Sequence, residues 1–292
     1  MNERTVTKKI NLGGWLFVLP ATLLICILNF YPMFNSFLLS LQTGRGNNLK
    51  FAGLKNYARL FEDEIFLTSV GNVVTYLIIQ VPFMLLLALV LASLLNDPKI
   101  RGKAIFRTLI FLPCATSLVS SAILFRSFFS IDGLVNSFLM ELGLLGRPLS
   151  WLTHPIWAKF VIIFAITWRW TGYNTVFYLA GLQNIDPNIY EAARIDGASA
   201  SRQFFLITIP LLKPVILLTS IISTNGTLQL FDEVKTLTNG GPGIATLSIS
   251  QYIYNLTFMY NPQFGYAAAV SYVILVMVAL LTFLQIKIGR KR

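Results

Sequence analysis

Charged side chains are scarce in this sequence of 292 residues. Only 12% of the residues are Asp, Glu, Lys or Arg, whereas an average soluble domain carries about 25%. Hydrophobic residues make up 55% of the chain, and its mean hydropathy is +0.67. A soluble core could hold some of this excess, but not runs of about twenty apolar residues without a solvated face. The scarcity of charge therefore excludes an ordinary soluble domain and indicates an integral membrane protein.

Cysteine and histidine are also nearly missing, with two and one residues respectively. Cys26 and Cys114 each lie within an apolar run, so neither a disulfide framework nor a zinc site is expected. His154 is predicted to lie in an outer loop, where a single histidine is usually solvated. The sequence has no G-x-x-x-x-G-K-[ST] phosphate loop, no Ser/His/Asp set and no paired carboxylates. We therefore expect no metal site, no cofactor bound by this chain and no enzymatic activity of its own.

Acidic residues are missing from the middle of every predicted span, since all twelve fall in termini, loops or span ends. Ion-coupled transporters usually bind their coupling ion through a carboxylate or histidine at membrane depth. The absence of such residues in mid-span disfavours an ion-coupled secondary solute transporter, which stays as the alternative from another functional class. The net charge of +11 is attributed to Lys and Arg at the cytoplasmic flanks of the spans rather than to nucleic-acid binding.

Six apolar stretches are long enough to cross a bilayer core of about 30 Å. Their residues are 12–41, 70–95, 105–129, 156–182, 211–231 and 267–288. The first contains Pro20 and Pro32, so a tilted or kinked helix is expected there. Lys8 and Lys9 precede it as in a signal peptide, but the run is too long and lacks a small-x-small cleavage site. Between the third and fourth spans, residues 133–145 could form a short amphipathic helix on the outer surface.

Basic residues indicate the orientation, because Lys and Arg gather in cytoplasmic segments. They concentrate in the N-terminus, the second and fourth loops and the C-terminus: Arg4, Lys8, Lys9, Lys99, Arg101, Lys103, Arg107, Arg194, Arg202, Lys213, Lys287, Arg290, Lys291 and Arg292. The first loop is also basic, but three acidic residues follow its basic ones. We predict an all-α integral membrane protein with six transmembrane helices and both termini cytoplasmic. Residues 1–11 would be an N-terminal tail, and residues 12–292 one membrane domain.

The loop between the fourth and fifth spans has about thirty residues and a helix pattern of its own. Pro187 stands at its start, and Glu191, Ala192 and Ala193 place small residues and a negative charge in the first turn. Gly197 is expected to end the helix. We predict a short cytoplasmic helix at about residues 188–206, suited to docking into a groove on another protein. An ordinary connecting loop is the alternative.

This loop resembles the E-A-A-x3-G-x9-I-x-L-P signature of permease subunits of bacterial ABC importers. The matching residues are Glu191, Ala192, Ala193, Gly197, Ile207, Ile209 and Pro210, with Ile209 in place of Leu. Leu182-Gln-Asn-Ile-Asp-Pro, Asp196-Gly-Ala-Ser and Asn239-Gly-Gly-Pro resemble the carbohydrate branch, the maltose, lactose and glycerol-phosphate type permeases. The resemblance covers essentially the whole chain and implies the type I ABC importer permease fold.

The resemblance also implies partners. A second related permease would complete a heterodimer, two cytosolic ABC ATPase subunits would bind ATP and Mg, and an extracytoplasmic solute-binding protein would deliver a mono- or oligosaccharide. The chain would then be a multi-pass protein of the bacterial cytoplasmic membrane, surrounded by lipid, and would work by alternating access. A glycerol-phosphate-type substrate stays as an alternative. The residues that would dock into the ATPase are Glu191, Ala192, Ala193, Asp196, Gly197 and Ala198.

Span four carries an unusual polar and aromatic group: Trp168, Arg169, Trp170 and Tyr173. Aromatic rings can stack on the C–H faces of a sugar, and an arginine inside a span indicates function by default. An interfacial aromatic belt with a snorkelling Arg169 is the alternative. The resemblance aligns Trp168 and Tyr173 with sugar-site positions of maltose-type permeases and leaves the role of Arg169 open.

Span five contains Ser223, Thr227 and Gln229. Ser223 and Thr227 are four residues apart and share a helix face, and the resemblance aligns both with the sugar site. Hydrogen bonding between helices is the alternative. Weaker candidates for the substrate path are Asn72, Gln80, Ser117 and Ser121. The turn sequence Asn239, Gly240, Gly241 and Pro242 would, by the resemblance, lie at an outer gate near the binding protein.

Overall fold

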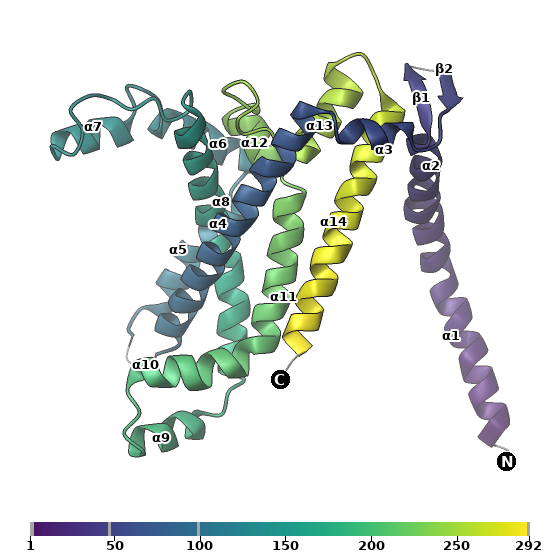
Figure 1. The fold of residues 1–292 in the computed structure, drawn as a ribbon. Coiled ribbons are helices and arrows are strands. Elements are labelled where there is room, and N and C mark those ends of the chain that lie inside the picture. The colour runs from purple at the N-terminus through teal and green to yellow at the C-terminus, as the bar shows by residue number, and fades with distance from the viewer. Residues whose placement is uncertain (1–2, 46–47, 98–99, 291–292) are drawn as a thin grey trace. The chain divides into compact units, whose positions relative to one another are not determined.

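The computed structural model describes residues 3–45, 48–97 and 100–290, and Figure 1 shows their course. Three of the basic residues counted above, Lys99, Lys291 and Arg292, lie outside these ranges. The chain forms two compact units, Met1–Glu62 with Ile253–Tyr272 and Asp63–Tyr252 with Val273–Arg292. Both units consist mainly of helices, so the predicted all-α class is confirmed apart from one small hairpin.

The smaller unit begins with one long helical segment. Helix α1 (Glu3–Ile25) continues through the π-helical turn η1 (Cys26–Phe30) into α2 (Tyr31–Ser40). α1 therefore starts inside the stretch predicted as a tail. A hairpin of β1 (Gln42–Arg45) and β2 (Asn48–Phe51) and the short helix α3 (Lys55–Leu60) follow, and η3 (Asn255–Met259) belongs to the same unit. The buried Asn56 amide donates to the Ser40 and Gln42 carbonyls at 2.8 and 2.7 Å, which satisfies the carboxyl end of α2.

The larger unit contains most of the remaining helices. They are α4 (Glu64–Asn96), α5 (Lys103–Ala115), α6 (Leu118–Phe128), α7 (Leu134–Glu141), α8 (Pro155–Gln183), α9 (Pro187–Ile195), α10 (Ala200–Gln203), η2 (Phe204–Thr208), α11 (Ile209–Leu228) and α12 (Asp232–Leu237). α13 (Ile249–Tyr254) and α14 (Phe264–Arg290) complete the chain. α4 packs along α8 more extensively than any other pair of described elements. α7 confirms the short helix expected between the third and fourth spans.

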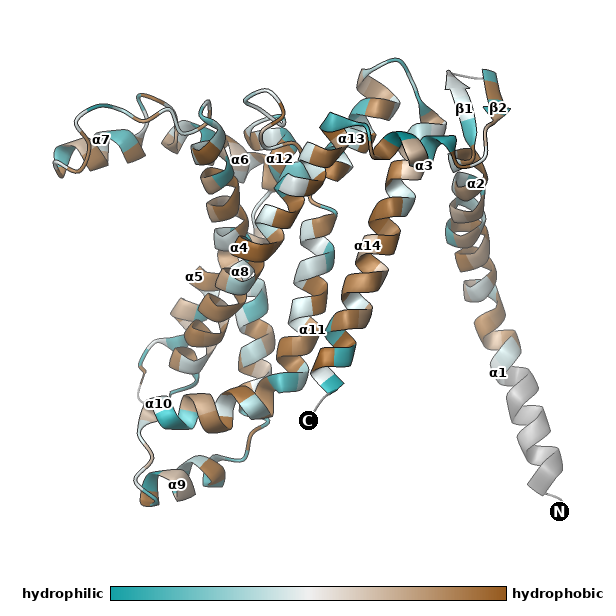
Figure 2. Cartoon of the chain, in the orientation of Figure 1, coloured by the Kyte–Doolittle hydropathy of each residue, from teal (hydrophilic) through white to brown (hydrophobic). Residues whose placement is uncertain are grey.

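Four described helical segments are long and apolar enough to cross a membrane: Gly14–Ser40, Glu64–Asn96, Ala200–Leu228 and Phe264–Arg290. Figure 2 shows apolar residues along most of α4 and α14. α8 does not meet the same measure although it has 29 residues. Its polar side chains Thr167, Thr171, Asn174 and Thr175 are buried in the bundle, so this helix is shielded by its neighbours. The count of six crossings and the cytoplasmic position of both termini stay predictions.

The stretch 105–129, predicted as one span, is instead two helices, α5 and α6, which meet at 96°. Pro113 near the end of α5 removes a backbone donor. Thr116 and Ser117 then leave the helical conformation, with ψ of 152° and 133°. The Thr116 hydroxyl donates to the Pro113 carbonyl at 2.7 Å, a local bond that competes with continued helix. The pair is therefore a broken span or a re-entrant segment.

Candidate functional site

The loop after α8 forms the helix that its sequence predicts, over a shorter range. The Asp186 carboxylate accepts from the Asn188 N–H at 2.9 Å, and Pro187 occupies the first turn of α9. The helix ends at Ile195, and Gly197 follows with φ of +75°. The Gly197 N–H donates to the Arg194 carbonyl at 3.1 Å, and the Ala198 N–H donates to the Ala193 carbonyl at 2.9 Å. This is the Schellman ending, so the predicted stop at Gly197 is confirmed.

The prediction of one helix over about residues 188–206 was too long. A second helical segment begins at α10, where the Ser199 hydroxyl accepts from the Arg202 N–H, and it continues through η2 into α11. The Tyr190 and Thr208 hydroxyls lie 3.0 Å apart, and the Gln203 amide donates to the Ala198 carbonyl at 2.8 Å. These bonds fasten α9 to the segment that becomes α11. In Figure 1 the two lie next to one another where α8 ends.

The surface of α9 is open to a partner. No residue of the helix is buried; Glu191, Ala192, Asp196 and Gly197 are exposed, and Ala193 and Ala198 are half-buried. Ile195, which the sequence reasoning missed, has 87% of its side chain exposed. Glu191 lies 4.0 Å from Arg194 in an exposed ion pair, which contributes little to stability. This surface combines small residues, the charged Glu191, Arg194 and Asp196 and the large apolar Ile195, and it is suited to a groove on another chain.

The aromatic group on α8 does not line a single wall. The Trp168 ring meets Phe125 of α6 edge-on with the ring centres 5.2 Å apart, and 40% of the residue is exposed. Trp170 points elsewhere and packs edge-on against Tyr173 at 5.8 Å. Residues two apart on a helix face opposite sides, so Trp168 lies apart from Trp170 and Tyr173.

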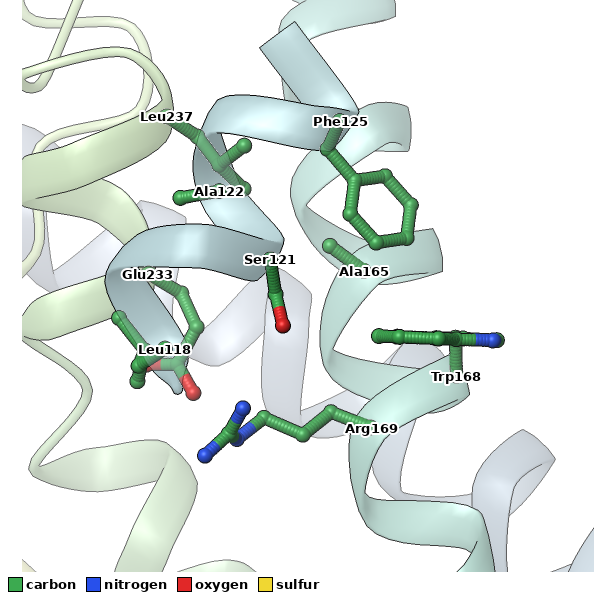
Figure 3. A pocket seen from close by; sticks show the side chains of 9 residues that line it. All are labelled: Leu118, Ser121, Ala122, Phe125, Ala165, Trp168, Arg169, Glu233 and Leu237. Atoms are coloured by element: carbon green, nitrogen blue, oxygen red, sulfur yellow. The ribbon is translucent and has the colours of Figure 1, made fainter. Parts of the chain in front are cut away.

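Arg169 points into the bundle, toward a small cavity between α6, α8 and α12 (Figure 3). Its Nη1 donates to the Thr116 carbonyl at 3.1 Å, at the break between α5 and α6. Arg169 is thus half-buried and bonded to another helix, which differs from the outward snorkelling given as the alternative interpretation. Glu233 of α12 lines the same cavity and accepts a long hydrogen bond of 3.4 Å from the Trp170 indole.

Glu233 is a functional candidate that sequence reasoning missed. It follows the fifth span by a few residues and so was counted as a loop residue, but α12 packs against α6 and α8 and leaves it only 9% exposed. Burial raises the pKa of its carboxyl group. Hydrogen bonds from its own backbone and Trp170, and the charge of Arg169, oppose that rise. The one available signal was the acidic pair Asp232 and Glu233 placed directly after an apolar run.

Ser223 and Thr227 share a helix face, as predicted, and both meet polar groups of neighbouring helices. The buried Thr227 hydroxyl donates to the Gln80 amide oxygen of α4 at 3.2 Å. The half-buried Ser223 hydroxyl lies 3.5 Å from the Asn174 amide oxygen of α8. Thr227 thus makes the hydrogen bond between helices that was its alternative interpretation. Gln229 lies apart from this group, exposed at the end of α11.

The turn Asn239, Gly240, Gly241 and Pro242 belongs to a loop with a fixed course. Asn239 and Gly240 have φ of 52° and 86°, which explains the choice of asparagine and glycine there. The Asn72 amide of α4 donates to the Ile244 and Leu247 carbonyls at 3.1 and 3.0 Å. Asn72, a weak candidate for the substrate path, therefore fastens this loop to α4.

Comparisons with known proteins agree with these features. The family profile described as binding-protein-dependent transport system inner membrane component matches residues 85–291. The lactose transport system permease protein LacF of Rhizobium radiobacter is 56% identical over 293 residues, which span 100% of this chain and 98% of that protein. The trehalose/maltose transport system permease protein MalF of Thermococcus litoralis is 35% identical over 283 residues, 96% of this chain and 94% of that protein.

Solved structures share the fold. One chain of a bacterial ABC transporter involved in the import of the acidic polysaccharide alginate superimposes with a TM-score of 0.86 at 25% identity. The superposition covers 99% of both chains. The fold described above is therefore shared with one chain of a solved bacterial ABC transporter.

Proposed function

The chain belongs to the family of inner membrane components of binding-protein-dependent transport systems, among the sugar permeases of ABC importers, and from this we propose how it works. It receives a mono- or oligosaccharide from an extracytoplasmic solute-binding protein and passes it to the cytoplasm by alternating access. A lactose-type disaccharide is the first candidate substrate, because the 56% identical relative is named a lactose permease. ATP and Mg are bound by separate ATPase subunits.

The proposed assembly pairs this chain with a second, related permease in the bacterial cytoplasmic membrane. Two cytosolic ATPases dock on the inner side, and the solute-binding protein docks on the outer side. The loop at Asn239, Gly240, Gly241 and Pro242 serves as the outer gate. The Asn72 amide of α4 anchors the loop just after this turn, at the Ile244 and Leu247 carbonyls, and so fixes one side of it.

The observation that carries the proposal is the connection between α9 and α11. The exposed residues Glu191, Ala192, Asp196 and Gly197 offer a docking surface, and half-buried Ala193 and Ala198 complete it. The Tyr190–Thr208 and Gln203–Ala198 bonds tie this surface to the helix that continues into α11. A displacement imposed on α9 by an ATPase is therefore passed to α11 as a rigid-body motion.

The proposed sugar path uses the residues whose polar or aromatic faces stay accessible. Trp168 is 40% exposed, Tyr173 and Ser223 are half-buried, and Gln229 is exposed. Tyr173 would stack on the sugar and Ser223 would hydrogen-bond its hydroxyls, whereas Trp168, on the other side of α8, and Gln229, at the end of α11, would contact it at other points of the path. Trp170 and Thr227 support this wall through Glu233 and Gln80. Arg169 has a different role.

Uptake of labelled lactose into proteoliposomes tests the proposal. The vesicles contain both permeases and both ATPases, with binding protein outside and ATP inside. We expect uptake that requires ATP and the binding protein. Uptake driven by an ion gradient without the ATPase would overturn the importer assignment. ATP-dependent uptake of labelled glycerol phosphate, with no uptake of labelled lactose or other neutral sugars, would replace the substrate class while keeping the importer.

A further inference from the structure

We propose that the half-buried Arg169 and the buried Glu233 form a charge pair that holds the break between α5 and α6 against α8 and α12. In this arrangement Arg169 is a positioning residue for transport and does not contact the sugar. The transport readout of this inference rests on the proposed function, whereas the structural readout does not.

The break supplies the first half of the argument. Where α5 ends, the Thr116 carbonyl lacks the helical partner that an unbroken helix would provide. Arg169 donates to it from α8 at 3.1 Å, so the arginine replaces the missing bond. The Thr116 hydroxyl and Ser121 lie 2.9 Å apart and close the other side of the turn. Three helices thus meet at one polar point.

Glu233 supplies the second half. A positive guanidinium inside a helix bundle is costly unless a negative charge lies nearby. α12 folds back against α6 and α8 and brings the carboxylate, only 9% exposed, to the same cavity as Arg169. Figure 3 shows both side chains directed into it. Arg169 from α8 and Asp232 on α12 are the charged groups that act on Glu233. The charge of Arg169 also acts on the Cys114 thiol of α5. The Ser121 hydroxyl of α6 lines the cavity as well.

The cavity itself excludes a sugar as the bridging group. Its volume is about 20 Å³, enough for one water molecule and too small for a sugar ring. Its polar lining consists of Arg169, Glu233 and Ser121, which together offer the two to four partners that a buried water needs. The Arg169 Nε is buried and has no hydrogen-bond partner among the described residues, so it remains available to such a water.

The physics of buried pairs gives a distinctive mutational pattern. Removing one partner leaves an uncompensated buried charge, whereas replacing both by neutral groups of similar size is often tolerated. Arg169→Met should therefore reduce sugar uptake by at least about tenfold, and adding Glu233→Gln should restore most of it. Arg169→Lys keeps the charge and loses the planar fork, so it should lie between. If Arg169 instead bound sugar, Glu233→Gln would rescue nothing.

The structural readout is thermal unfolding of the purified permease pair at several pH values. In Arg169→Met, buried Glu233 loses its positive neighbour, so its folded pKa rises further above the unfolded value of about 4.3. The contribution of Glu233 to the stability of this variant is therefore complete below about pH 4.3, and it is lost as pH rises through the raised folded pKa. We expect the Tm of Arg169→Met to fall with rising pH relative to the wild-type protein. In the double variant this extra dependence disappears.

Each outcome of these two measurements supports or overturns the Arg169–Glu233 charge pair. Rescue of uptake together with loss of the extra pH dependence supports the charge pair. Uptake near the wild-type level in Arg169→Met overturns it, as does equal loss in the single and double variants. Because the Tm measurement needs no sugar, it can succeed even if the substrate assignment fails. The proposed function itself is judged by uptake in the wild-type protein.

Discussion

Gly197 offers the sharpest test of the docking surface, because its two possible roles can be separated. Its φ of +75° is a conformation that other L-residues adopt at a cost of about 1–2 kcal/mol. A Cβ atom at this position would meet nothing within 4 Å. Within this chain, alanine and tryptophan at position 197 should therefore cause the same backbone cost. Since the first side-chain atom meets open space, a further loss with tryptophan would indicate a contact with another protein.

The expected magnitudes follow from that separation. Gly197→Ala should destabilise the turn conformation by about 1 kcal/mol, which is about fivefold in its equilibrium constant. Uptake should fall by no more than that factor. Gly197→Asn should lie closest to wild type, because asparagine tolerates this conformation. Gly197→Trp adds a large ring to the surface on which the ATPase would close. We expect it to abolish both uptake and co-purification with the ATPase, while insertion in the membrane is normal.

Gly243 provides a matched control for the tryptophan variant. It has φ of +59°, its Cβ would also meet nothing within 4 Å, and it directly follows the turn proposed as the outer gate. Gly243→Trp should therefore leave co-purification with the ATPase intact. Normal ATPase binding by Gly197→Trp would refute the docking surface. Equal damage from Gly197→Ala and Gly197→Trp would instead assign the effect to backbone conformation.

Three further predictions concern packing and the path. Asn136→Ala removes a buried amide that accepts from the Leu149 N–H and the Trp151 indole and donates to three backbone carbonyls. Because these groups lose their partner, the free energy of unfolding should fall by about 2–4 kcal/mol in thermal scans. An unchanged Tm contradicts this. Gly172→Ala places a Cβ against the Ile110 carbonyl oxygen of α5 and should lower the free energy of unfolding by about 1–3 kcal/mol, whereas Gly71→Ala, whose Cβ meets nothing within 4 Å, should not destabilise its helix. Ser223→Ala should raise the KM for sugar, while Thr227→Val should lower the Tm with KM unchanged; the reverse pattern would place Thr227, not Ser223, in the path.

Features encoded within a few neighbouring residues were predictable from the sequence. Pro187 and Gly197 mark the start and stop of α9 because each acts on its own backbone conformation. The long apolar runs gave α4 and α14 for a similar reason, since burial in lipid requires every turn to be apolar. The extent of the loop helix was mistaken because residues 200–206 continue into α11, and no local signal distinguishes a short helix from the first turns of a longer one.

The break between α5 and α6 could not be predicted because its stabilising partner is distant in sequence. The Thr116 carbonyl is satisfied by Arg169, 53 residues further along the chain. Seen alone, Pro113 is compatible with a kinked but continuous span, and Arg169 alone is compatible with snorkelling. The role of each becomes apparent only from the contact between Arg169 and the break, with Glu233 at the same cavity in a segment predicted as a loop. An arginine within a polar, aromatic stretch of a span is therefore better interpreted together with nearby helix breaks than as a ligand contact on its own.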